Sequence, residues 1–252
     1  MKIQTFIRMI FSRKCTPTIV LFLALSNPFN ALHAQMVKII SSSDLNNLPA
    51  SDLFTFLEPS LDTATFVFVA SIQAKDRDRK EIIESMYFAI REQAIKLGAN
   101  SFRLNSFTRD TLDSEAFLVL DCYFATDEIL NINRSLREVN AVFLFGEERK
   151  DSKSMKVDVN KEEKEIKAGT YLKYVLNENE ELLLSKGGVT GSSLLLKGEK
   201  ETKSTFYSLS GFGLGELSRQ PANGISFNSG RINKISNMSL GLLMVELLQQ
   251  GN

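Results

Sequence analysis

The sequence of 252 residues has few of the side chains that most often perform covalent chemistry or bind metals. It has no tryptophan, one histidine, His33, and two cysteines, Cys15 and Cys122. His33 and Cys15 lie within the first 34 residues, which have the pattern of a removed export signal. A chain that begins at Gln35 has no imidazole and one thiol. This excludes Ser-His-Asp and Cys-His catalysis, histidine-bound zinc or haem, and an intramolecular disulfide.

Long apolar runs are also lacking. The run at residues 19–25 follows the basic pair Arg13 and Lys14 and precedes a polar stretch that ends with the small residue Ala34. A membrane-spanning helix needs about 20 apolar residues, whereas this arrangement is typical of a signal peptide. We therefore predict a signal peptide over residues 1–34 and a mature chain without a transmembrane segment. The short signal and the lone thiol favour a bacterial envelope protein, exported to the periplasm or the cell surface.

An excess of positive charge is absent as well. The whole chain has 30 basic and 30 acidic residues. The signal removes four basic residues and no acidic ones, so the mature chain has 26 basic against 30 acidic residues and a net charge of −4. Nucleic-acid binding requires a basic surface that neutralises phosphates. The charge balance therefore predicts no nucleic-acid partner.

The first half of the mature chain predicts a small α/β domain over residues 63–130. Before it, residues 35–62 are expected to be a lead-in of short helical pieces on the surface, because apolar residues from Leu45 to Leu57 recur at mixed spacing that Pro49 and Pro59 interrupt. Within the domain, β-branched and aromatic runs predict strands, and an apolar stripe at three- and four-residue spacing predicts a helix. The predicted order is a strand at 65–73, a helix at 82–97, and strands at 101–107 and 116–125.

The second half, residues 139–252, alternates between apolar and polar side chains and predicts an antiparallel β-sandwich-like domain. A short helix and linker over 127–138 separates the two domains, so the whole chain is of the α+β class. Residues 239–250 fit either a capping helix or a last strand, because Gly241 weakens the helix prediction. The expected strands lie at 141–145, 155–159, 169–176, 181–185, 193–197, 205–209 and 224–228.

The strand at 116–125 carries two residues of functional interest. Cys122 lies on an apolar face, where a thiol is normally an inert small hydrophobic group. Asp121 lies on the other face with Phe117 and Tyr123, where an acid needs a partner. Arg103, on the preceding strand, could reach across as that partner. The pair is either a structural ion pair or a ligand-binding pair.

Arg231 is a third candidate binding residue. It follows a glycine turn among hydrogen-bonding side chains, a setting that could hold a carboxylate or a sugar. The alternative is an ordinary exposed loop arginine.

Two loops resemble ligand-binding motifs but depart from them in decisive positions. Residues 211–215 have the spacing G-x-G-x-G, whereas dinucleotide binding needs G-x-G-x-x-G at the start of a helix. Residues 158–169 begin like a calcium loop, but the sixth position is Glu163 instead of glycine and the twelfth is Gly169 instead of glutamate. The sequence therefore predicts no cofactor and no metal site.

The helix predicted at 82–97 ends in a run that resembles a known family. Leu97, Gly98, Ala99 and Asn100 turn directly into a strand, as in the YbjQ-like proteins, which are sometimes described as heavy-metal-binding, and in related small bacterial envelope domains. The resemblance covers residues 65–125 and implies a compact α/β fold. It does not imply metal binding, because this stretch has no histidine and one cysteine. Residues 141–209 resemble β-rich domains of other exported bacterial proteins.

These features together predict a non-catalytic binding or assembly module of the envelope, whose partner is another envelope protein or a small ligand. One alternative is a hydrolase that uses Asp/Glu or Ser/Lys groups on loops of the β-domain. Another is a carrier that holds a small apolar ligand in a cavity behind Phe117, Val119 and Tyr123.

Overall fold

The computed structural model of the chain contains three helices and fourteen strands within the residues that it describes. The strands form three mostly antiparallel sheets, so the α+β class is confirmed and β-structure predominates. All described residues belong to one compact unit, Gln35–Asn252, and the division into two domains stays a prediction. The described residues are 36–45, 48–49, 51–62, 64, 66–76, 83–109, 115–148, 152–187, 191–209 and 232–251.

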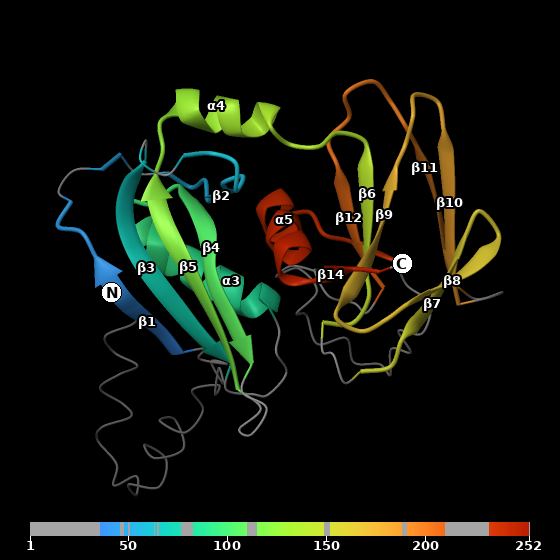
Figure 1. Ribbon diagram of the computed structural model, residues 1–252, viewed down its shortest axis with the longest axis horizontal. Helices are drawn as coiled ribbons and strands as arrows, with labels where there is room; N and C mark the ends of the chain where they lie inside the picture. The colour runs from blue at the N-terminus through green and yellow to red at the C-terminus, as the bar shows by residue number, and fades with distance from the viewer. Residues whose placement is uncertain are drawn as a thin grey trace, which may run out of the picture. The chain divides into compact units, whose positions relative to one another are not determined.

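The first sheet has five strands, and the helix α3 (Ile83–Lys96) covers one of its faces (Figure 1). Neighbouring strands are antiparallel except for the last pair, which is parallel. The predicted strand–helix–strand–strand order is confirmed. In spatial order the strands are β1 (Met36–Ser42), β3 (Val67–Asp76), β5 (Ala116–Phe124), β4 (Ser101–Arg109) and β2 (Thr55–Phe56).

The apolar stripe of α3 packs on the sheet, and the helix ends as its sequence predicts. Gly98 has a φ of 89°, the left-handed conformation that glycine adopts most readily. Its N–H donates to the carbonyl of Ile95, and the next N–H, of Ala99, donates to the carbonyl of Ala94, both at 3.0 Å. This pair of bonds is a Schellman motif and satisfies carbonyls that the helix end leaves open.

The segment 35–62 is not the surface layer of helical pieces that its spacing predicts. It supplies two strands of the first sheet, β1 and β2, and Phe54, Phe56 and Leu57 are at most 5 % exposed. The local spacing does not reveal these strands because each forms by pairing with a later segment, β1 with β3 and β2 with β4.

The second half forms two further sheets that face each other across an apolar core, so the sandwich prediction holds in outline. One sheet is wholly antiparallel and the other contains two parallel pairs, so the sandwich is not entirely antiparallel. The first of these sheets is β11 (Ser192–Lys197), β10 (Glu181–Lys186), β7 (Met155–Val159) and β8 (Glu162–Ile166). The second is β13 (Asn233–Lys234), β12 (Thr205–Ser208), β6 (Ala141–Phe145), β9 (Thr170–Val175) and β14 (Gln249–Gln250).

β8 is a strand that the sequence pattern did not predict. Asn160 and Lys161 have φ values of 51° and 71°, which is the geometry of a two-residue type I′ hairpin. Val159 pairs with Glu162 directly across this turn. The polar run 160–163 predicts a turn of four residues, but Glu162 and Glu163 already belong to β8. The strand predicted at 224–228 lies outside the described residues.

The helix α5 (Met238–Leu247) settles the open alternative for residues 239–250: residues 239–247 are helical, and β14 follows. Asn237 caps the helix by accepting a hydrogen bond from the N–H of Leu240 at 3.0 Å. Gly241 lies where the helix meets the ring of Phe206, and a Cβ atom at this position would approach that ring to 2.4 Å. The glycine that weakened the helix prediction is therefore needed for close packing.

One continuous core extends from the first sheet through α5 to the sheet that contains β6. It includes Phe102 of β4, Leu243 of α5 and Phe206 of β12. β6 is buried on both faces: Phe143 and Phe145 contact this core, while Val142 and Leu144 contact the core of the sandwich. The described parts of the two halves therefore share apolar packing through α5.

Candidate functional site

The two candidate residues Arg103 and Asp121 lie opposite each other on β4 and β5. They lie on the face of the first sheet opposite α3, which we call the outer face. Arg103 donates through Nη2 to the carbonyl of Glu58 at 2.8 Å and to that of Leu61. Asp121 accepts instead from Asn105 Nδ2 at 3.0 Å. The expected ion pair is therefore replaced by bonds to other groups.

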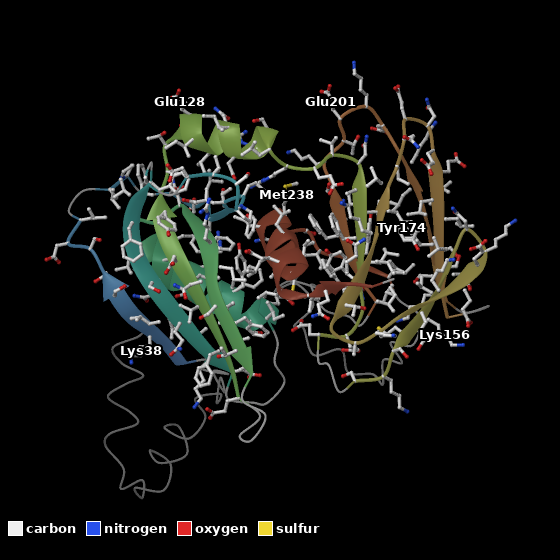
Figure 2. All side chains as sticks on the ribbon, viewed as in Figure 1. Lys38, Glu128, Lys156, Tyr174, Glu201 and Met238 are labelled. Carbon is white, nitrogen blue, oxygen red and sulfur yellow. The ribbon has the colours of Figure 1, made fainter. Side chains whose placement is uncertain are left out.

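The arginine's contacts lead to a group of charged side chains that we call the Glu58 cluster: Glu58, Arg103, Arg137 and Glu246. Arg137 Nε lies 3.7 Å from Glu58 Oε1, and the two side chains are 14 % and 18 % exposed. Arg137 also donates to the carbonyl of Phe56 at 3.1 Å and contacts the sulfur of Met238 at 3.2 Å. Figure 2 shows Met238 at the start of α5.

A buried asparagine holds the loop after β2 beside this cluster. Asn133 lies in α4 (Asp127–Ser135), whose N-cap is Thr126, and is fully buried. Its Oδ1 accepts from the N–H of Glu58 and its Nδ2 donates to the carbonyl of Phe56, both at 2.8 Å. The side chain thus replaces the backbone partners that this loop lacks.

Burial shapes the electrostatics of the cluster. It raises the pKa of Glu58, against the smaller opposing effect of Arg137. The pKa of Glu246 is raised by protein packed around its carboxylate and, to a lesser extent, by the charge of Glu58, while Arg103 opposes the shift. Burial also lowers the pKa of Arg137. Each carboxyl therefore keeps its proton to a higher pH than usual.

The polar atoms of the cluster are incompletely paired. Among the described residues, Glu58 Oε1, Arg103 Nε and Arg137 Nε are buried without a hydrogen-bond partner. Nη2 of each arginine donates to backbone carbonyls of the segment 56–61, and Nη1 of Arg137 is directed to the sulfur of Met238. In this arrangement the cluster fixes a loop onto the sheet and α4.

The outer face carries aromatic and polar side chains that are partly exposed. Phe68 and Tyr123 meet edge to face, with ring centroids 5.8 Å apart. At the other end of β5, the ammonium of Lys75 lies 5.5 Å from the centre of the Phe117 ring and pairs with Glu115. Phe117 and Tyr123 are therefore partly exposed side chains of the sheet surface.

Cys122 is buried in the core beneath this face. Burial raises the pKa of its thiol, and the charge of Asp121 raises it further. A thiol that stays protonated is a poor nucleophile, in agreement with the predicted inert role. Arg231, the third candidate, lies outside the described residues, as does the segment 1–34.

A pocket of about 350 Å³ lies at the start of α4, lined in part by Pro49, Asn100 and Asp127. The amide of Asn100 is bonded in both directions to the backbone of Ala125, at 2.7 and 2.8 Å. Within the described part of the chain, no three His, Cys, Asp or Glu side chains are grouped as metal ligands. None of the helices there is long and apolar enough to cross a membrane.

Sequence reasoning missed Glu58, Arg137 and Glu246. They lie far apart along the chain, on a loop, a linker and a helix, and no local spacing connects them. The only usable signal was Arg103, whose position on a half-buried strand required acceptors.

Comparison with known proteins adds no relative to these observations. No family model matches the chain, and no match was found among curated proteins or among solved structures. The resemblance of residues 65–125 to the YbjQ-like proteins therefore stays a prediction.

Proposed function

We propose that the chain is an exported bacterial envelope protein that acts as a non-catalytic binding or assembly module. The outer face of the first sheet is its binding surface. The export part of the proposal rests on the signal-peptide pattern of residues 1–34, with a mature chain that begins at Gln35.

The observation that carries the proposal is the composition of the outer face. Partly exposed aromatic rings, Phe68, Phe117 and Tyr123, lie on it together with the polar side chains Gln73 and Asp121. Aromatic groups provide large contact areas and are enriched in protein–protein interfaces, and polar groups beside them add directional bonds. A sheet face also presents these groups on a rigid support.

The Glu58 cluster supports a structural role for the buried charges. Its arginines donate to backbone carbonyls, and Asn133 binds the same loop from α4. These bonds position residues 56–61 over one end of the outer face. The cluster therefore shapes the proposed surface without taking part in a reaction.

The experiment is a quantitative capture of partners from the native envelope with two matched variants. Lys75→Glu breaks a strand ion pair on the outer face, and Lys156→Glu breaks a similar pair, with Glu163, on the sandwich (Figure 2). We expect Lys75→Glu to lose about tenfold or more of the captured partner, whereas Lys156→Glu keeps it. A stoichiometric protein indicates an assembly module, and a small molecule indicates a ligand-binding module. Equal capture by both variants contradicts the assignment of the surface.

The export claim has its own measurement. N-terminal sequencing of the protein from its source should give Gln35 as the first residue. An intact Met1 in the native protein would rule out cleavage at this position.

One observation favours a second candidate, a hydrolase. Glu58 and Glu246 both belong to the Glu58 cluster, and both have raised pKa values. Such acids are candidates for general acid catalysis, although Glu58 lies outside the β-domain loops to which the sequence assigned this role. If ester or glycoside hydrolysis is found, Glu58→Gln and Glu246→Gln should each abolish the alkaline limb of its pH–rate profile while the fold is kept, because a general acid must be protonated to act. Unchanged profiles exclude the pair.

A further inference from the structure

The two edges of the antiparallel sheet of the sandwich are protected very differently. β8 carries Glu162, Glu163, Lys164 and Glu165 along its length, a pattern that prevents pairing with other chains. β11 has no charge before Lys197, no proline, and a regular register with β10 along its whole length. Its central Leu195 is 59 % exposed. Natural proteins normally avoid such an edge unless it is paired.

The backbone of β11 has bonding capacity on its outer side. In an antiparallel pair, successive residues direct both their backbone groups alternately toward and away from the neighbour. The N–H of Gly198 donates to the carbonyl of Glu180 at 2.8 Å, on the side of β10. With no bulge in the register, Ser193, Leu195 and Lys197 therefore direct their N–H and C=O groups away from β10. None of the described residues forms a strand on that side.

We propose that β11 pairs antiparallel with β11 of a second copy of this chain, with the two-fold axis at Leu195. In this register Leu195 lies opposite the partner's Leu195, and Ser193 lies opposite the partner's Lys197. All the outward groups of the three residues are then used in cross-strand bonds. A register shifted by two residues leaves some of these backbone groups unpaired. A shift by one residue places side chains from opposite faces of the two strands beside each other.

The charges fit this arrangement. Lys197 meets the partner's Ser193 and not a second lysine, so no like charges are opposed. Beyond it, the same row of the exposed sheet surface continues through Ser185 to Asp158, which faces Glu163. Within its own chain, Lys197 lies opposite Glu181 of β10, so an acid and a lysine are neighbours on each side of the proposed interface. The analogous pairing of β8 would bring several glutamates together.

The apolar side chains gain as well. Leu194 and Leu196 contact the core of the sandwich but are only partly buried at this edge. In the proposed register, Leu194 lies opposite Leu196 of the second copy, and Leu196 lies opposite Leu194 of the second copy. The two cores therefore become continuous. On the exposed surface, Leu183 and Leu195 are neighbours across β10 and β11, and the dimer extends them into a stripe of four leucines.

Pairing of one short strand gives an interface at the low end of the size range for specific contacts. The dimer should therefore be concentration-dependent, with a dissociation constant on the order of micromolar. This proposal goes beyond the binding role of the outer face, which lies on a different sheet, and either can fail without the other.

The first test is sedimentation equilibrium of the purified chain over about three orders of magnitude in concentration. The wild type should change from monomer to dimer mass. Leu195→Lys should stay monomeric, because two ammonium groups would face each other. Val175→Lys is the matched control, since Val175 is 55 % exposed but lies on β9, inside another sheet. A wild type that is monomeric at all concentrations, or equal effects of the two variants, overturns the proposal.

The second test determines the register, and it does not require that the Leu195→Lys variant folds. Leu195→Cys should be joined to its copy by a short bismaleimide, because paired Cα atoms lie about 5.5 Å apart. Ser193→Cys should react several-fold less, since its copy lies about four residues away along the strand. Cys122 is buried and does not compete. Equal yields from both variants contradict pairing at Leu195.

Discussion

Replacement of Gly241 by alanine tests whether α5 packs on Phe206 as closely as the structure shows. A Cβ atom at residue 241 would lie 2.4, 2.6 and 2.8 Å from three carbons of the Phe206 ring. The ring cannot move aside, because it is 2 % exposed and stacks on Phe143 with centroids 5.1 Å apart. The variant must therefore shift the helix or distort the stack.

Two effects of opposite sign determine the magnitude. Overpacking of a core costs about 1–3 kcal/mol, and the contact distances here place the cost at the upper end. Alanine in place of glycine inside a helix gains about 1 kcal/mol. The net expectation for Gly241→Ala is a loss of about 2 kcal/mol in the free energy of unfolding.

The assay is urea unfolding of wild type, Gly241→Ala, Phe206→Leu and the double variant. A smaller side chain at 206 makes room for the new methyl group, so the double variant should be more stable than the sum of the single effects by at least about 0.5 kcal/mol. Gly241→Ala that is more stable than wild type would refute the reasoning, because only the helical propensity would then matter. Additive single effects would show that the two residues are not in contact.

Three further predictions concern the Glu58 cluster and the core. Asn133→Ala should lower the free energy of unfolding by about 1–3 kcal/mol, because it leaves the N–H of Glu58 without its partner and removes one of the two bonds to the carbonyl of Phe56, whereas Asn131→Ala, on the exposed side of the same helix, should change it by less than about 0.5 kcal/mol in the same urea titration. The raised pKa of Glu58 means that the folded state binds a proton more tightly than the unfolded state. Its contribution to stability is therefore complete below the ordinary glutamate pKa of 4.5 and is lost as pH rises through the folded pKa. Urea midpoints measured from about pH 4 to about pH 7 should therefore fall less in Glu58→Gln than in wild type, and an identical slope would argue against the shift. Cys122 should not react with a thiol reagent in the native protein and should react fully in denaturant, so rapid native labelling would contradict its burial.

Local periodicity predicted the helix and most of the strands. The stripe from Ile83 to Ala94 and the glycine after it depend only on neighbouring residues, and the structure follows them. The strands at 141–145 and 155–159 have the predicted bounds. In these segments the side-chain pattern and the burial coincide, so one sequence window contains the whole signal.

Pairing between distant segments was not predictable in this way. β2 is two residues long and exists because Thr55 and Phe56 lie beside β4, about 45 residues away. β8 is almost entirely charged, and its pairing follows from the hairpin at Asn160 and not from hydrophobicity.

The candidate site was predictable only in part. The expectation that Arg103 could reach across to Asp121 agrees with their opposite positions on β4 and β5. The partners of Arg103 are carbonyls of a loop near residue 58, and no pattern in the sequence brings that loop to β4. Side-chain partners depend on which segment crosses the sheet, and this is decided by the tertiary fold.

The position of α5 has a consequence for the order in which the protein folds during synthesis. The helix packs on β2, β4 and β12 and contributes to the core that the first sheet and β6 share. It is made after all of these strands, because a ribosome releases the chain from its N-terminus. Until residues 238–247 emerge, Phe102 and Phe206 lack the helix that covers them. The nascent chain should therefore reach its full stability late, and it should remain sensitive to proteases until α5 has been made.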